Sequence, residues 1–83
     1  MSAAARVVLF SRPGCHLCDD ARVVLERAGH PFEEIDITSD DALHARYLER
    51  IPVVTIDGDE AFEFFVDEVL LCRRLGRVAP SGP

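Results

Sequence analysis

The chain has 83 residues, of which 48% are hydrophobic and 29% charged, and its formal net charge at pH 7 is −6. This length supports one domain with one compact core, and the hydrophobic content excludes extensive disorder. Nucleic acid attracts basic surfaces, and a bilayer span needs about 20 apolar residues in a row, so neither is an expected partner of this chain. We therefore expect a single domain over residues 1–83, present as a monomer.

A strand and a helix are predicted first along the chain. Val7 to Phe10 is a short apolar run with β-branched residues, which favours a strand buried on both faces. The turn-forming residues Ser11 to Gly14 separate it from a helix that begins at Cys15 and ends at Gly29. Apolar residues at helical spacing mark the face expected to be buried: Cys18, Ala21, Leu25 and Ala28.

The middle of the chain alternates between strands and a short helix. Phe32 to Ile37 is predicted as the second strand, and the hydroxyl and acidic residues that follow favour the start of a helix over Ala42 to Leu48. Val53 to Ile56 is predicted as the third strand. Asp57-Gly58 is typical of a two-residue hairpin turn, so a partner strand is expected from about Glu60 to Phe64.

A last helix is predicted from its capping residue Asp67 to about Val78, and residues 79–83 are expected to form a frayed tail. The right-handed crossover rule makes the first two strands parallel, and the hairpin makes the last two antiparallel. The predicted fold class is therefore α/β, a four-stranded mixed sheet with three helices on its two faces in the order βαβαββα. The residues expected on the inward side of the last helix are Val69, Cys72, Leu75 and Gly76.

Cys15 and Cys18 are the candidate catalytic residues. They lie three residues apart at the start of a predicted helix, where side chains are about 5–6 Å apart, within the range that a disulfide bridges. Cys15 lies at the helix N-terminus, which favours a thiolate, so it is expected to attack; Cys18 points inward and is expected to resolve the mixed disulfide. Arg12, and His16 when protonated, would help to hold the thiolate.

Other roles for the cysteine pair remain open at this point. Residues 1–6 show no basic segment followed by a long apolar stretch, so we expect no signal peptide and a cytoplasmic location, where structural disulfides are rare. A structural role, an iron–sulfur cluster shared by two protomers, or a zinc site would be alternatives. Zinc would need further ligands from His16, His30, His44 or Cys72, which show no second paired spacing. His30 and His44 are expected at the surface, and Cys72 in the core.

The chain resembles the glutaredoxin branch of the thioredoxin superfamily, in particular a bacterial group called glutaredoxin-like. The resemblance covers nearly the whole chain and is carried by three segments: Val7 to Cys18, Ile51-Pro52-Val53-Val54, and Asp67 at the start of the last helix. It implies a thioredoxin fold, a cis peptide bond at Pro52, and backbone beside Pro52 that binds an extended thiol peptide. Arg12 matches the basic residue that contacts the glutathione carboxylate in glutaredoxins.

The sequence departs from glutaredoxins at two places. His16-Leu17 replaces their Pro-Tyr between the cysteines, and Phe64 and Phe65 replace a Gly-Gly pair. Because bulky side chains there favour protein disulfides, the prediction is a thiol–disulfide oxidoreductase acting on proteins or low-molecular-weight disulfides, without a bound cofactor. Glutathione, another thiol or a cellular reductase would regenerate it, and a non-catalytic binding module is the alternative. The candidate substrate-binding residues are Arg12, His16, Ile51, Pro52 and Asp67.

Overall fold

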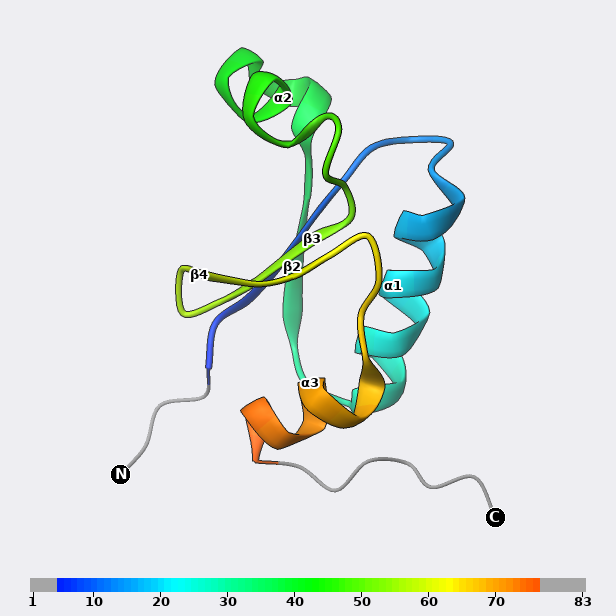
Figure 1. Ribbon diagram of the computed structural model, residues 1–83, viewed down its shortest axis with the longest axis vertical. Helices are drawn as coiled ribbons and strands as arrows, with labels where there is room; N and C mark the ends of the chain where they lie inside the picture. Colours follow the sequence, from blue (N-terminus) through cyan, green and yellow to red (C-terminus); the bar gives the residue numbers. More distant parts are fainter. Residues whose placement is uncertain (1–4, 77–83) are drawn as a thin grey trace.

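The computed structural model describes residues 5–76, which form four strands and three α-helices in the predicted order (Figure 1). It therefore confirms the α/β fold class, while the expected tail at 79–83 lies outside the described residues. A short 3₁₀ turn, η1, was not predicted. The elements are β1 (Val7–Ser11), α1 (His16–Ala28), β2 (Phe32–Asp36), η1 (Ile37–Ser39), α2 (Asp41–Tyr47), β3 (Val53–Ile56), β4 (Asp59–Glu63) and α3 (Glu68–Leu75).

The four strands form one mixed sheet in the order β2-β1-β3-β4. β1 pairs with β2 in parallel, and the pairs β1–β3 and β3–β4 are antiparallel. The parallel orientation of β1 and β2 and the antiparallel orientation of β3 and β4 are the ones predicted. The hairpin between β3 and β4 turns through Asp57 and Gly58, whose φ angles of 53° and 87° are both positive, as a two-residue turn of this kind requires. The sheet places the carboxyl end of β1 at its centre, where the chain leaves toward α1.

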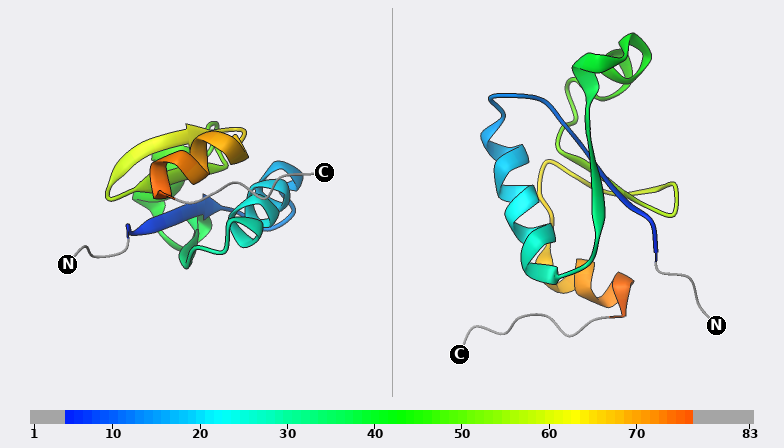
Figure 2. Two further views of the ribbon diagram at one scale, coloured as in Figure 1. Left: turned by 90° about the horizontal axis from the view of Figure 1, so that it is seen from below. Right: turned by 180° about the vertical axis from the view of Figure 1, so that it is seen from behind.

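Side chains of β1 alternate between two cores, one on each face of the sheet. Val7 and Leu9 belong to the core covered by α1 and α3. Val8 and Phe10 belong to the other core, where the Phe10 ring stacks on Tyr47 of α2 with centroids 4.6 Å apart. The two views in Figure 2 show α1 running alongside the sheet with α3 near its far end. No helix within residues 5–76 combines the length and the apolar content that crossing a membrane demands.

The first helix forms as predicted because both of its ends and its buried face are specified locally. Cys15 is the N-cap, and Gly29 ends the helix in the left-handed conformation with φ 72°, which glycine adopts without a steric penalty. Its buried residues are the four that the helical spacing marked: Cys18, Ala21, Leu25 and Ala28.

The last helix differs from its prediction in length and in orientation. It ends at Leu75, because Gly76 has φ 69° and its N–H bonds back to the Arg73 carbonyl, which closes the helix. Val69, expected to face inward, is 52% exposed, whereas Leu71 and Cys72 are buried. The inward side is therefore rotated toward Leu71, and the predicted burial of Cys72 is confirmed.

Two local expectations are also wrong. β4 ends at Glu63, and Phe64 leaves the strand with a φ of 67°, in the left-handed region and outside the range of regular β-strands. His30 is buried rather than at the surface, since its ring Nε2 donates a hydrogen bond of 2.7 Å to the Ala5 carbonyl.

Candidate active site

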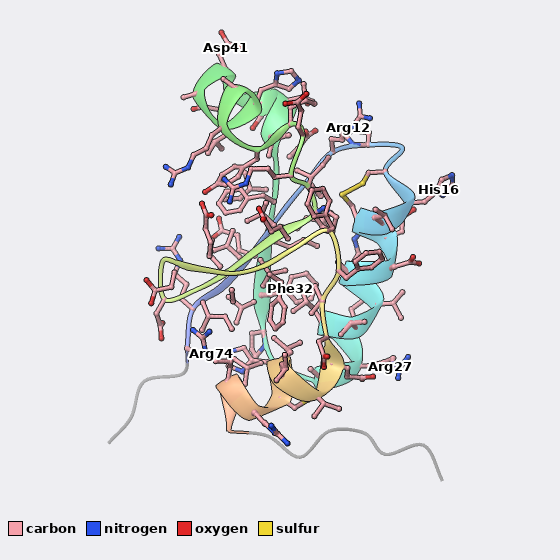
Figure 3. All side chains as sticks on the ribbon, in the orientation of Figure 1. Arg12, His16, Arg27, Phe32, Asp41 and Arg74 are labelled. Carbon is pink, nitrogen blue, oxygen red and sulfur yellow. A yellow bond between two sulfur atoms is a disulfide. The ribbon has the colours of Figure 1, made fainter. Side chains whose placement is uncertain are left out.

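Cys15 and Cys18 form a disulfide at the N-terminal end of α1, with Cα atoms 5.2 Å apart (Figure 3). This separation lies inside the range of about 4.4–6.8 Å that disulfides allow, as the spacing predicted. The two residues differ in accessibility. Cys15 is half-buried, whereas the side chain of Cys18 is fully enclosed in the core that contains Phe10 and Ile51.

The helix start places hydrogen-bond donors at the sulfur of Cys15. As N-cap, Cys15 has an extended backbone, and its Sγ accepts the backbone N–H of Cys18 at 3.2 Å. The first backbone N–H groups of a helix have no partners within the helix, and the helix dipole adds positive potential at this end. A thiolate at Cys15 would accept the same N–H group as a charge-assisted hydrogen bond. The geometry therefore favours the anion at Cys15.

Pro52 follows a cis peptide bond with Ile51, which confirms the configuration implied by the family resemblance. Ile51 and Val53, its neighbours, pack in the same core as Cys18, and Cys15 packs against that core. The Ile51 N–H donates to the Tyr47 carbonyl at 3.1 Å. This backbone donor of Ile51 is therefore engaged within the chain.

The other predicted site residues are Arg12, His16 and Asp67. Arg12 and His16 are exposed, and Figure 3 shows both side chains pointing away from the disulfide. Asp67 caps α3, since its carboxylate accepts the Leu70 N–H at 3.0 Å. The structure thus brings together Cys15, Cys18, Ile51 and Pro52, and leaves Arg12 and His16 at the rim.

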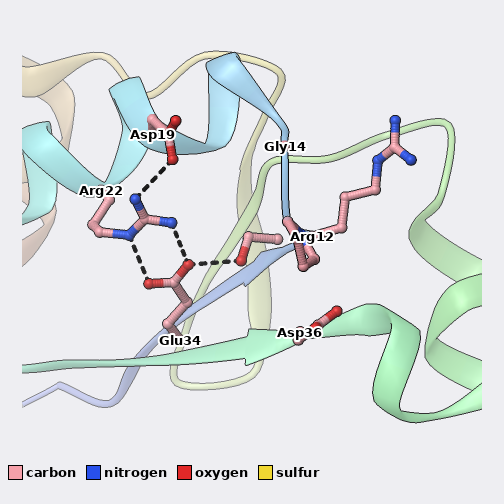
Figure 4. Close-up of a pocket in the computed structure, with 8 residues that line it drawn as sticks. Arg12, Gly14, Asp19, Arg22, Glu34 and Asp36 are labelled. Atoms are coloured by element: carbon pink, nitrogen blue, oxygen red, sulfur yellow. Dashed lines mark hydrogen bonds and ion pairs between the residues drawn. The ribbon is translucent and has the colours of Figure 1, made fainter.

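A polar network beside the loop that carries Cys15 was not predicted (Figure 4). Arg22 of α1 binds Glu34 of β2 through two nitrogens, at 2.7 and 2.6 Å, and also binds Asp19 at 2.8 Å. The Ser11 hydroxyl donates to Glu34 at 2.7 Å. These groups line a pocket of about 380 Å³ with Arg12, Pro13, Gly14 and Asp36. The hydrogen bonds from Arg22, and secondarily from Ser11, hold the pKa of Glu34 below its usual value.

Large apolar side chains are exposed on the other flank of the disulfide. Leu17, Phe64 and Phe65, here called the apolar patch, line a small groove of about 80 Å³ together with Asp20, Ala21, Val24 and Val66. Two backbone hydrogen bonds hold the segment that carries Phe64 and Phe65. The Phe64 N–H donates to the Pro52 carbonyl at 2.9 Å, and the Phe65 N–H donates to the Glu63 carbonyl at 2.8 Å. The patch therefore adjoins both the cysteine pair and the cis-proline loop.

Within residues 5–76, no three His, Cys, Asp or Glu side chains are grouped closely enough to hold a metal ion. Of the histidines considered as zinc ligands, His30 is bonded to the Ala5 carbonyl and His16 points outward.

Comparisons with known proteins agree with the fold. The glutaredoxin-like domain family matches residues 6–76. An N-acetyl-S-hydroxy-L-cysteine reductase from Bacillus subtilis (strain 168) is 33% identical over 68 residues, covering 76% of this chain and 73% of that protein. The X-ray structure of the X. campestris protein XcR50 is 31% identical, with a TM-score of 0.74 over 84% of this chain and 95% of its own. Glutaredoxin from Brucella melitensis is 26% identical, with a TM-score of 0.63 over 90% of this chain and 85% of its own.

Proposed function

This chain belongs to the glutaredoxin-like domain family, and we propose that it is a thiol–disulfide oxidoreductase that works through Cys15 and Cys18. A redox role at this coarse level is supported by the family and by the similarity to a protein named as a reductase. The observation that carries the proposal is the unequal placement of two sulfurs that are close enough to bond. Cys15 is accessible and lies at a helix N-terminus, whereas Cys18 is enclosed behind it.

The proposed reaction proceeds by two exchanges. The Cys15 thiolate attacks one sulfur of a substrate disulfide, forms a mixed disulfide and releases the other substrate half as a thiolate. Cys18, deprotonated, then attacks the sulfur of Cys15, forms the Cys15–Cys18 disulfide and releases the second half. The two released thiolates take up the two protons that the cysteines lost, so two electrons pass from the protein to the substrate. An external thiol such as glutathione, or a cellular reductase, returns the dithiol form.

Protein disulfides are the substrates that we favour. In place of a Gly-Gly pair the chain has Phe64 and Phe65, whose backbone N–H groups are already bonded to Pro52 and Glu63. These donors are therefore not free for the backbone of a small peptide such as glutathione. The partners proposed are accordingly disulfide-containing proteins, with low-molecular-weight disulfides as weaker substrates.

Reduction of insulin disulfides and of hydroxyethyl disulfide by the reduced protein tests the proposal. Wild type is expected to reduce a disulfide, and Cys15→Ser to lose the activity. Cys18→Ser should keep the first exchange and accumulate a mixed disulfide, which mass spectrometry detects. Equal activity in wild type and Cys15→Ser would rule the mechanism out. Stoichiometric zinc or iron in protein purified under reducing conditions, without turnover, would favour the binding-module alternative.

A second candidate function follows from the similarity to the Bacillus reductase, whose name describes a sulfenic acid substrate. The same two cysteines can carry it out, because the Cys15 thiolate attacks the sulfenic sulfur, forms a mixed disulfide and displaces hydroxide, which leaves as water after taking up the proton that Cys15 lost. Cys18 then releases the substrate thiol. Consumption of a small-molecule sulfenic acid, compared with that of the matching disulfide, separates the two candidates. Faster turnover of the sulfenic acid by wild type, absent in Cys15→Ser, would favour the second.

A further inference from the structure

We propose that the apolar patch formed by Leu17, Phe64 and Phe65 is the docking surface for a polypeptide segment that carries an apolar and a basic residue beside its cysteine. The inference rests on the proposed function and specifies the class of substrate for the same site. Its evidence is the exposure, backbone conformation and charge of this flank of the disulfide.

The patch gathers apolar surface that the fold itself does not use. Phe65 is 72% exposed, and Phe64 and Leu17 are each more than one-third exposed. Together they line one groove, although single apolar residues scattered over a surface would be ordinary. Leu17 lies between the two cysteines, and the Phe64 N–H is bonded to the Pro52 carbonyl. A segment seated on the patch therefore lies beside Cys15.

The backbone at Phe64 points to the same conclusion. Its φ of 67° is in the left-handed region, where a side chain is disfavoured and glycine is not. A phenylalanine at this position exposes much of its ring to water, so burial in the core does not account for it. Strain of this kind at a surface beside reactive groups indicates a recognition role.

Charge selects the occupant of the groove. Asp20 lines it and forms no ion pair with any other side chain in residues 5–76, and the chain as a whole carries a net charge of −6. An anionic small molecule would be repelled, whereas a basic side chain next to an apolar one would meet both Asp20 and the rings. Oxidised glutathione is anionic and lacks an apolar side chain, so it matches the patch poorly.

Two peptide mixed disulfides with nitrothiobenzoate test the inference, one with Phe and Lys beside its cysteine and one with Ser and Glu. Wild type is expected to show kcat/KM at least about tenfold higher for the Phe–Lys peptide. In Phe65→Ala, the kcat/KM for the Phe–Lys peptide divided by the kcat/KM for hydroxyethyl disulfide should fall about fivefold or more, mainly because the KM for the peptide rises. Asp20→Asn should reduce only the part of the preference that depends on Lys.

Leu70→Ala is the matched control, because Leu70 is another exposed apolar residue and lines a separate pocket with Arg73 and Arg74. In Leu70→Ala, the ratio of kcat/KM for the Phe–Lys peptide to that for hydroxyethyl disulfide should stay within about twofold of the wild-type ratio. If Phe65→Ala also stays within that range, or if wild type does not distinguish the peptides, the docking surface is wrong. The proposed function then still stands, provided that Cys15→Ser is inactive with both peptides. If wild type reduces none of the three disulfides, both proposals fail together.

Discussion

Replacing Glu34 with Gln is expected to weaken the attachment of the Cys15 loop to the sheet. Glu34 accepts hydrogen bonds from Arg22 and from the buried Ser11, which directly precedes the loop that carries Cys15. A geometrically good surface ion pair contributes about 0.5–1 kcal/mol, and a hydrogen bond to a charged group about 1.5 kcal/mol before exposure is allowed for. The Glu34 and Arg22 side chains are about one-third exposed, so we expect a loss of about 1–2 kcal/mol in the free energy of unfolding at pH 7.

This loss should depend on pH with a defined sign. Because the folded pKa of Glu34 is lowered, its contribution is fully present above the unfolded value of about 4.5 and disappears as the pH falls through the folded value. The difference between wild type and Glu34→Gln should therefore be largest at pH 7 and shrink toward pH 3.

Urea denaturation at a series of pH values measures this difference. Glu33→Gln is the control, because Glu33 is a neighbouring, more exposed carboxylate with one partner, Arg6, and should change stability by less than about 0.5 kcal/mol. Equal stability of Glu34→Gln and wild type at pH 7 would refute the reasoning. So would a loss that persists unchanged at pH 3, since it would then come from packing rather than charge.

Three further predictions address the helix ends and the cysteines. Asp67→Ala should lower stability by about 1 kcal/mol in thermal denaturation, whereas Asp67→Asn should keep most of the wild-type stability, because either Asp or Asn can cap α3. Similar losses in both variants would point to another role for this carboxylate. Gly29→Ala should cost about 1 kcal/mol in urea denaturation, since φ is 72°; a stabilised variant would contradict the left-handed cap. In the reduced protein, iodoacetamide should modify Cys15 before Cys18 and Cys72, as followed by mass spectrometry, because only Cys15 is accessible; faster modification of Cys18 would reverse the assigned roles.

Local rules predict those parts of the fold where one segment specifies its own geometry. The hairpin follows from Asp57-Gly58, and α1 follows from a capping residue, a terminal glycine and an apolar stripe, so its bounds and buried face agree with the structure. The cysteine pair is predictable for the same reason, since its spacing and its position at a helix start are both local. The cis bond at Pro52 came from family resemblance, because an X-Pro bond is trans in most folded proteins.

Features that depend on contacts between distant segments could not be obtained in this way. In α3, three consecutive apolar residues, Val69 to Leu71, make the helical phase ambiguous, and packing against α1 selects Leu71 rather than Val69. The Arg22–Glu34 pair joins α1 to β2, and neither residue alone indicates its partner. Phe64 adopts a glycine-like backbone that no propensity predicts for phenylalanine.

The different roles proposed for the two sulfurs and the packing of the core have one origin in the periodicity of α1. Cys18 begins the apolar stripe that continues through Ala21, Leu25 and Ala28, so the stripe that buries the helix also encloses the sulfur proposed to resolve the mixed disulfide. Cys15 precedes the helix as its cap, outside that stripe, and so its sulfur stays accessible beside the first free N–H groups. One residue inserted between them would rotate Cys15 by about 100° relative to the buried stripe and separate the sulfurs, while the stripe itself stayed buried. The pairing of the two sulfurs, on which the proposed mechanism depends, is therefore more sensitive to this spacing than the buried stripe is.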